Sequence, residues 1–406
     1  MQYLLSNIEA LLTDVFMSME QTGIRISIDE LLKFDKYIGN LIEQTKQSIY
    51  DDAGHEFDIL SPQQLGKVLF EELDLPSKRK YQNQKYTNIH EIEELRDRYP
   101  IVDNILKYRQ YSKLYQTYVK GIYDHISPDG KLYMHFHIDA RTGRVSTEYP
   151  NIQNIPVRVE LGSQLKKFFI AGEGRVLIDA SYEQIEMRVM ANLCRDKNMI
   201  KILSSGNDFH TSTAALLFDI PIQKVTPDMR EIAKSVNFSV IYGIGAYSLS
   251  KCIGTSIAQS QRYIQKHREI FPEENNYIEE AVDRAKDTGY AITMFGRKRP
   301  IPELKSSNKM LQAMGKRIAI NYPINGTVSD IINIAMIKVY HKLKAEKIPA
   351  QLILQVHDEL IVESDVSCAS RCQDLLREEM LSVCKMTLPP VVEIRHGASW
   401  YEAKKE

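Results

Sequence analysis

Residues 230–243 read REIAKSVNFSVIYG and carry two cations and two aromatic rings at intervals of four residues. Arg230, Lys234, Phe238 and Tyr242 therefore follow one slowly turning face of a predicted helix. Two cations one turn apart can bind a triphosphate, and the rings beyond them offer a flat surface to a sugar and a base. Basic and aromatic residues at this spacing are more often ordinary surface and core, so this stretch alone leaves both interpretations open.

Residues 355–360, QVHDEL, place two adjacent carboxylates between branched apolar residues. This pattern predicts a tight turn between two strands, with Asp358 and Glu359 at the turn. Burial of two neighbouring carboxylates is costly unless cations share their charge. An isolated Asp-Glu pair is most often a surface turn, and a metal-binding turn is the alternative.

These two stretches belong to a set of five motifs that occur in a fixed order along residues 142–360. The other three are TGRVSTEYPNIQNIP at 142–156, DASYEQIEMR at 179–188 and KRIAINYPINGT at 316–327. The set resembles DNA polymerase family A, the DNA polymerase I-like enzymes, and shorter matches at TGIRI and in the helical regions extend the likeness over the whole chain. The resemblance implies template-directed DNA synthesis by two-metal nucleotidyl transfer, with primer–template DNA and deoxynucleotides as partners.

The resemblance assigns the nucleotide-binding residues. Arg230 and Lys234 would contact the triphosphate, Phe238 would pack against the incoming sugar and base, and Tyr242 would guard the template-base position. His210, in the stretch DFH at 208–210, would lie near the triphosphate. A phenylalanine at position 238, where some relatives carry tyrosine, implies discrimination against dideoxynucleotides.

Two further nucleotide-site residues follow from the match at 179–188. Gln184 and Glu186 stand at the family's nucleotide-binding positions, and Glu186 matches the glutamate that crowds the sugar 2′ position. A 2′ hydroxyl would clash with this side chain and leave its hydrogen bonds unsatisfied. DNA rather than RNA synthesis is therefore implied.

The same resemblance assigns the DNA contacts, which would fix the primer–template through its backbone and minor groove. His357 would meet the primer end, and Asn325 replaces the family's glutamine, which shortens the reach of one minor-groove contact. The full set is Arg141, Arg144, Asn151, Gln153, Asn154, Arg297, Arg317, Asn321, Asn325 and His357.

One catalytic position departs from the family pattern. The family reads DYSQIELR where this chain reads SYEQIEMR at 181–188, so Ser181 stands in place of the metal-binding aspartate. The catalytic set is thus Asp358, Glu359, Asp179 and Ser181, and the candidate metal ligands are Asp358, Asp179 and Tyr182. Two Mg²⁺ ions are implied, with Mn²⁺ able to substitute, and a serine cannot replace the missing charge.

Three hypotheses about the second metal-binding carboxylate remain open. Asp179 lies two residues upstream on the same strand face, about 6.6 Å from Ser181, and could act through water or through a local bulge. Glu183 would lie on the same face if the strand continued. Alternatively, no effective second carboxylate exists and activity is weakened or lost.

The expected fold is α+β: a right-hand polymerase with an antiparallel-sheet palm, a helical thumb and helical fingers. Helical periodicity dominates residues 28–125 and 190–345, with helices expected at 28–54, from Ser61-Pro62 and at 91–126. Branched runs predict strands at 131–139, 175–182 and 352–364. The expected ranges are an N-terminal segment at 1–27, thumb at 28–125, first part of the palm at 126–188, fingers at 189–312 and second part of the palm at 313–406.

Composition limits the class of protein without naming one. The 406 residues are 43% hydrophobic and 26% charged, which is typical of globular enzymes. Because the net charge is only −1, any DNA must bind to a local basic surface. KKFF at 166–169 is one basic cluster, interpreted as a solvated face. Five scattered cysteines and the absence of an apolar span favour a cytoplasmic, monomeric protein without a membrane partner. We expect no proofreading domain, and a catalytically inactive primer–template-binding protein is the rival function.

Overall fold

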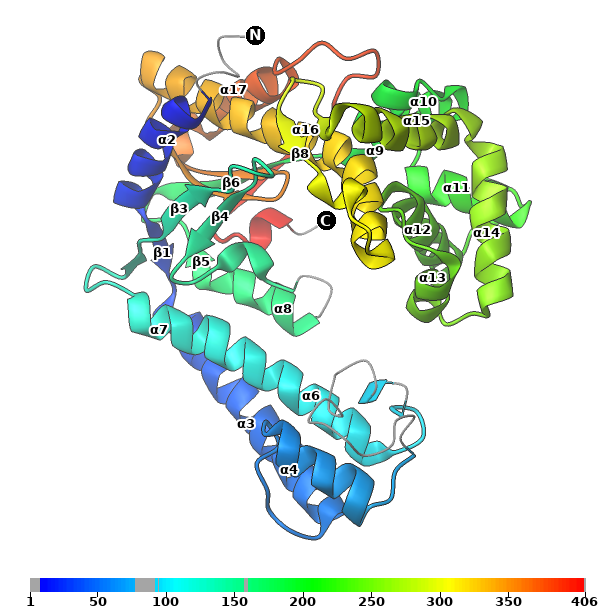
Figure 1. The fold of residues 1–406 in the computed structure, drawn as a ribbon. Helices are drawn as coiled ribbons and strands as arrows, with labels where there is room; N and C mark the ends of the chain where they lie inside the picture. The colour runs from blue at the N-terminus through cyan, green and yellow to red at the C-terminus, as the bar shows by residue number, and fades with distance from the viewer. Residues whose placement is uncertain (1–7, 77–91, 94, 157–159, 405–406) are drawn as a thin grey trace.

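The computed structural model describes residues 8–76, 92–93, 95–156 and 160–404. Residues 1–7 of the predicted N-terminal segment and residues 77–91 and 94 of the predicted thumb lie outside this part of the chain. Figure 1 shows a body built around a sheet, a long helical projection below it and a helical lobe beside it. Within the described residues, no helix is both long and apolar enough to span a membrane.

The central sheet has four antiparallel strands in the order β11-β6-β10-β9. Its strands are β6 (Arg175–Tyr182), β9 (Ala350–Val356), β10 (Glu359–Asp365) and β11 (Val392–Gly397). The predicted hairpin at QVHDEL is confirmed, and His357 adopts a left-handed backbone conformation (φ 53°) in its turn. β11 was not predicted, because charged residues interrupt its apolar pattern.

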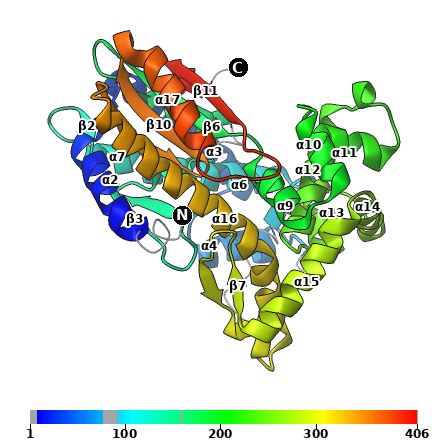
Figure 2. The same ribbon diagram turned by 90° about the horizontal axis from the view of Figure 1, so that it is seen from above.

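Helices cover the sheet and carry the N-terminal segment. In Figure 2, α17 (Ala369–Leu381) lies over the sheet, and it contacts β6, β10 and β11. The 37-residue helix α16 (Lys309–Ala345) contacts β9, α17 and α2 (Ile8–Thr22). The amphipathic helix expected at the N-terminus is thus present, with Leu12 and Val15 fully buried.

Three small antiparallel sheets accompany the central sheet in the described part of the chain. Their strands are β1 (Ile24–Ile26), β2 (Lys131–Leu132), β5 (Phe169–Ile170), β3 (His135–Ile138), β4 (Val145–Glu148), β7 (Tyr290–Ile292) and β8 (Lys298–Pro300). The single strand expected at 131–139 is therefore two short strands. The expectation of helix throughout 190–345 was also wrong at β7 and β8, a hairpin whose connection carries Arg297.

The helical projection is built on two long helices that pack along each other. They are α3 (Ile28–Ala53), which Ser27 caps, and α6 (Pro100–Leu114). Their companions are α4 (Pro62–Lys67), α7 (Gly121–His125) and π-helical turns at Val68–Glu72 and Tyr115–Lys120. The helix expected at 91–126 is interrupted: residues 92–93 are helical, residues 95–98 form a turn, and α6 begins at Pro100, because proline fits the first turn of a helix but not its interior.

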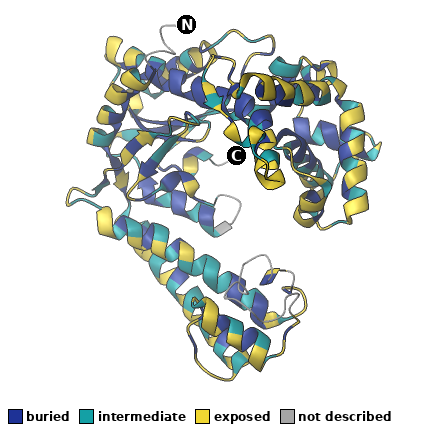
Figure 3. Ribbon diagram, in the orientation of Figure 1, coloured by how far each residue is buried: buried dark blue, intermediate teal, exposed yellow. Residues whose placement is uncertain are grey.

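The lateral lobe contains α9 (Ile185–Cys194), α10 (Lys197–Ser204), α11 (Phe209–Phe218), α12 (Pro227–Ile241), α13 (Ala246–Ile253), α14 (Ile257–Ile270) and α15 (Pro272–Thr288). Side chains such as Ala214, Val236 and Leu249 form its core. Figure 3 shows α14 with exposed residues on the side away from that core. The short α8 (Glu160–Gln164) and 3₁₀ turns at Ile152–Asn154, Leu165–Phe168, Ile222–Lys224, Pro302–Lys305, Val366–Cys368 and Glu402–Lys404 complete the fold.

Candidate active site

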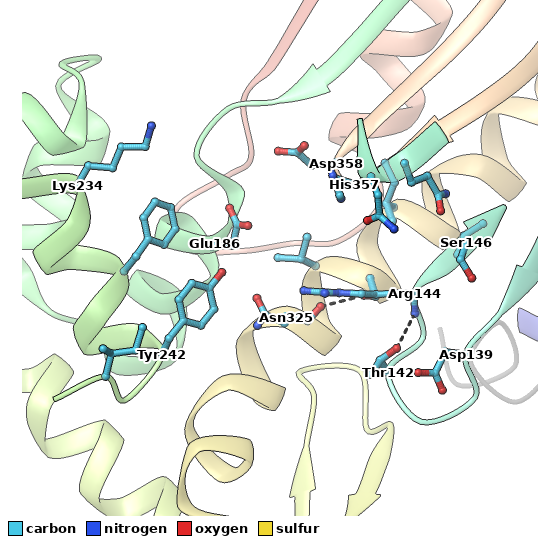
Figure 4. Close-up of a pocket in the computed structure, with 18 of the residues that line it drawn as sticks. Asp139, Thr142, Arg144, Ser146, Glu186, Lys234, Tyr242, Asn325, His357 and Asp358 are labelled. Atoms are coloured by element: carbon cyan, nitrogen blue, oxygen red, sulfur yellow. Dashed lines mark hydrogen bonds between the residues drawn. The ribbon is translucent and has the colours of Figure 1, made fainter. Parts of the chain in front are cut away.

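A cleft of about 910 Å³ opens between the central sheet and the lateral lobe. In Figure 4, Lys234 and Tyr242 approach it from α12 on one side, Arg144 and His357 approach from the other, and Glu186 and Asp358 lie between them. Eleven of the predicted site residues line this cleft: Arg144, Asn151, Gln153, Asn154, Glu186, Lys234, Phe238, Tyr242, Asn325, His357 and Asp358.

Helix α12 presents the motif as its spacing predicts. The Thr226 side chain caps its N-terminus and a proline occupies its first turn, so the helix begins immediately before the motif. The rings of Phe238 and Tyr242 stack with centroids 5.7 Å apart and an interplanar angle of 10°. The Lys234 ammonium lies at the cleft, 3.7 Å from the exposed carboxylate of Glu231. The helix thus offers one cation and an aromatic platform to the same space.

Arg230 lies outside the cleft lining because another helix holds its guanidinium. Its Nε and Nη2 each donate to Asp208 at 2.9 Å, and Gln184 Nε2 donates to the same carboxylate at 3.1 Å. Asp208 also caps α11 through Thr211. Burial would raise the pKa of Asp208, but the hydrogen bonds from Arg230 and Thr211 outweigh it and lower that pKa to about 2. The bidentate pair fixes α12 against α11.

The cleft brings two acidic side chains together. Burial, together with the neighbouring carboxylates of Glu186 and Glu359, raises the pKa of Asp358 to about 7. Like charges held this close favour either a proton or a bound cation. Asp358 therefore has the electrostatic surroundings of a cation ligand.

Asp179 is bound by cationic and hydrogen-bonding partners through both of its carboxylate oxygens. Lys404 Nζ lies 3.1 Å from Oδ1, and Trp400 Nε1 donates to Oδ2 at 3.1 Å. The same ammonium lies 2.9 Å from Glu359 Oε1, so the two carboxylates share one lysine. Burial and Glu359 raise the pKa of Asp179 to about 7, and Lys404 opposes that rise. Lys404 thus occupies the position of a counter-ion.

The bulge that would move Asp179 into register is absent. β6 pairs with β10 and β11 in continuous register, so Ser181 stands opposite Glu359 and next to Glu393. The strand ends at Tyr182, and Gln184 takes a left-handed conformation before α9, so the strand does not extend to Glu183 as its candidacy required. Glu183 is exposed and does not line the cleft.

Tyr182 is buried, and its hydroxyl donates to the Met380 carbonyl at 2.7 Å, so its side chain does not face the cleft. Within the described residues, no group of three or more His, Cys, Asp or Glu side chains is arranged to hold a metal ion. The donor set is the carboxylates of Asp358 and Glu186 at the cleft, a serine hydroxyl at position 181, and the Asp179 and Glu359 carboxylates that Lys404 binds. This set does not fit two divalent ions.

Two of the residues predicted to contact DNA, Gln153 and Arg297, are held by other parts of the chain. Gln153 is buried and donates to the Gln355 carbonyl at 2.9 Å, and Gln355 Nε2 donates to the His357 carbonyl at 2.6 Å, so the hairpin turn is held from behind. Arg297 is bound to the buried Asp330 at 2.7 Å. Gly143, at φ 74°, lies over this guanidinium, where a Cβ atom would approach Arg297 to 3.2 Å.

The remaining three predicted DNA contacts lie beyond the cleft lining. The Arg141 side chain is exposed, 3.5 Å from Asp139. Arg317 packs beneath Gly243 at the end of α12. Asn321 has a buried Oδ1 with no hydrogen-bond partner among the described residues.

Sequence reasoning missed the residues that surround Asp179. Trp400 and Lys404 lie in the C-terminal WYEAK stretch, to which no motif was assigned. Lys166 belongs to the KKFF cluster, which was interpreted as a solvated face, yet its side chain is buried and its Nζ lies 4.3 Å from the Trp400 ring centroid. The available signal was a single tryptophan four residues before a lysine. Its partner, Asp179 on β6, lies 221 residues away along the chain.

Comparison with known proteins agrees with this geometry. The sequence model of DNA polymerase family A matches residues 28–402, and the chain belongs to that family. DNA polymerase I of Caldicellulosiruptor bescii is 40% identical over 405 residues, and thermostable DNA polymerase I of Thermus aquaticus is 37% identical over 407 residues. The chain is covered to 99% in both alignments but spans about half of each relative (48% and 49%).

A solved structure gives the fold. The POL domain of Pol1 from M. smegmatis, in complex with DNA primer-template and dNTP, superposes with a TM-score of 0.94 at 33% identity, over 99% of this chain and 71% of that one. The chain therefore has the family's right-hand fold, in which an antiparallel palm carries a helical thumb and helical fingers.

Proposed function

We propose that this chain binds primer–template DNA and a deoxynucleoside triphosphate and catalyses template-directed DNA synthesis at a low rate. The observation that carries the proposal is the cleft in which α12 presents Lys234, Phe238 and Tyr242 opposite Arg144 and the QVHDEL turn. A protein that only held DNA would have no use for a cation and a stacked aromatic pair at this position. The solved relative carries primer-template and dNTP, which supports the same two ligands here.

In this proposal the expected subdomain ranges map onto the observed elements. The projection of α3 to α7 is the thumb, the α9–α15 lobe is the fingers, and the central sheet with α16 and α17 is the palm. Gln184, Arg230 and His210 act from the fingers toward the nucleotide. To reach a triphosphate, the Arg230 guanidinium must break its contacts with Asp208. Otherwise Arg230 acts indirectly, because its ion pair with Asp208 fixes α12 against α11.

The low rate follows from the carboxylate site. Family A polymerases generally depend on divalent metal, and such an ion would supply charge neutralisation at the triphosphate and the primer hydroxyl when bound. Here Asp358 is the carboxylate that could bind it, while Ser181 adds no charge and Lys404 binds Asp179. The same observation favours the second candidate function, a polymerase-like protein that binds primer–template and dNTP without chemistry.

A primer-extension assay separates the two functions. We expect slow, template-directed extension with Mg²⁺ and faster extension with Mn²⁺, whose higher affinity for a given oxygen or nitrogen site offsets a weak ligand set. Asp358→Asn should abolish extension in both metals and leave primer–template affinity unchanged. Extension that survives Asp358→Asn would come from a contaminant, and no extension in either metal would establish the non-catalytic function.

A further inference from the structure

A line of buried polar side chains crosses the fingers directly behind the nucleotide-binding face of α12. Asn237 lies on α12, His210 on α11, His267 on α14 and Glu274 on α15, so four helices each contribute one member. Each of the four is at most 6% exposed. A buried polar side chain is costly unless it is hydrogen-bonded, and the role of this line is not explained by packing alone.

The orientation of the Asn237 amide is set by Thr213. The Thr213 hydroxyl donates to the Phe209 carbonyl at 2.8 Å, so its oxygen can only accept from Asn237 Nδ2, 3.3 Å away. The same amide nitrogen lies 2.9 Å from His210 Nδ1. His210 therefore accepts at Nδ1, which in a neutral imidazole leaves the proton on Nε2.

The Oδ1 atom of the same amide determines which ring nitrogen of His267 donates a hydrogen bond. Asn237 Oδ1 lies 2.9 Å from His267 Nε2, so that ring nitrogen donates. His267 Nδ1 lies 3.5 Å from Glu274 Oε2, and neither atom has another hydrogen-bond partner within the described part of the chain. One proton shared between them satisfies both. Burial raises the pKa of Glu274 to about 8 and lowers the pKa of His267 to about 3, which places that proton on the glutamate.

We propose that Asn237, His267 and Glu274 are positioning residues that hold His210 as the neutral Nε2–H tautomer, ready to donate to a phosphate oxygen of the incoming nucleotide. The inference rests on the proposed function, in which His210 lies beside the triphosphate. Within the described residues, no partner accepts from His210 Nε2, and its ring lies 5.5 Å from the nucleotide-facing ring of Phe238. Because the His210 donor is already ordered before the nucleotide binds, no side-chain entropy is lost in ordering it during binding.

A matched pair of variants tests the proposal through nucleotide affinity. His267→Leu removes the donor to Asn237 Oδ1, which holds the amide together with Thr213, whereas His267→Gln keeps an amide donor at the same place. The dissociation constant of a dNTP is measured on a primer–template that ends in a dideoxynucleotide, at fixed Mg²⁺. We expect a rise of about tenfold for His267→Leu and at most about twofold for His267→Gln, with DNA affinity unchanged in both. Equal effects of the two substitutions would overturn the proposal.

A second measurement reads the tautomer without nucleotide. Long-range ¹H–¹⁵N spectra of histidine-labelled protein report which ring nitrogen carries the proton, and the His210 signals are assigned by their loss in His210→Gln. The unsubstituted chain should show His210 protonated at Nε2, as should Glu274→Gln, whose amide can donate to His267. Protonation at Nδ1 overturns the proposal even if His267→Leu fails to fold. The expected tautomer in a chain that binds no dNTP would instead refute the proposed function.

Discussion

At the scale of single residues, the serine at position 181 decides how well the site can work. Ser181 stands opposite Glu359 in continuous register, next to the turn that carries Asp358. Ser181→Asp should raise the primer-extension rate by about tenfold or more, because it adds a second carboxylate not bound by Lys404. Ser181→Asn is the matched control of similar size and no charge, and it should give no gain. Equal gains from both would show that charge at this position is irrelevant.

A second prediction at this scale concerns the choice of sugar. Glu186 lines the cleft beside Asp358 and Tyr242, where a 2′ hydroxyl would have to fit. Glu186→Ala should lower the preference for deoxy- over ribonucleotides by about tenfold to a hundredfold, because it removes both bulk and a carboxylate. Glu186→Gln keeps the bulk and should keep most of the preference. Single-nucleotide insertion with matched dNTP and rNTP measures the ratio, and an unchanged ratio in Glu186→Ala would exclude this residue as the gate.

At the scale of elements, the proposed function assigns α12 to nucleotide binding rather than to DNA binding. Its spacing was readable from sequence, because four residues per step define one helix face whatever the surroundings. Lys234→Ala should weaken dNTP binding by about tenfold or more while primer–template affinity changes less than about twofold, since the ammonium lies on the α12 side of the cleft, opposite Arg144, and the proposed function assigns it to the triphosphate. Lys224→Ala, an exposed lysine of the same lobe, is the control. A parallel loss of DNA affinity in Lys234→Ala would reassign the lysine to DNA.

The junction of α14 and α15 gives a pH-dependent prediction. The pKa of Glu274 is raised from its ordinary value of 4.5 to about 8, so the folded chain binds the proton more tightly than the unfolded chain. Its contribution to stability is complete below pH 4.5 and is lost as the pH rises toward 8. Glu274→Gln cannot titrate at this position, so its free energy of unfolding does not share the parent's loss at high pH. The difference in the free energy of unfolding between the variant and the parent should therefore be larger at pH 8.5 than at pH 6.5, by roughly a few kcal/mol. This window lies above the ordinary pKa of histidine, and parallel urea-unfolding results at the two pH values would contradict the assignment.

The sequence predicted elements where the pattern was local. β6 and the QVHDEL hairpin were found because branched apolar residues dominate them, and eleven site residues met in one cleft as the family resemblance implied. The start of α6 at Pro100 and the β7–β8 hairpin were missed because helical periodicity was extended across a proline and a turn. The surroundings of Asp179 could not be predicted, because Trp400 and Lys404 reach it only after the sheet has formed.

At the scale of the whole molecule, one ammonium and one indole N–H connect the C-terminal segment to Asp179 on the central sheet. Lys404 contacts Asp179 on β6 and Glu359 on β10, and Trp400 packs against Phe169 with ring centroids 5.6 Å apart. The cost of these buried carboxylates is therefore offset by a residue near the end of the chain. This arrangement also explains why Asp179 is a poor substitute for a metal-binding aspartate at position 181.

Loss of that ammonium should destabilise the whole fold rather than only the site. Lys404→Met keeps most of the side-chain volume but leaves Asp179 and Glu359 without their cation, and an uncompensated buried charge typically costs about 3–5 kcal/mol. Asp179 can escape this cost by taking up a proton, so the loss of stability should be larger at pH 8 than at about pH 5. Lys404→Arg keeps the charge and should lose much less. Urea unfolding of the three proteins at both pH values measures the effect, and equal stability of Lys404→Met and the parent at pH 8 would mean that Asp179 and Glu359 do not depend on this lysine.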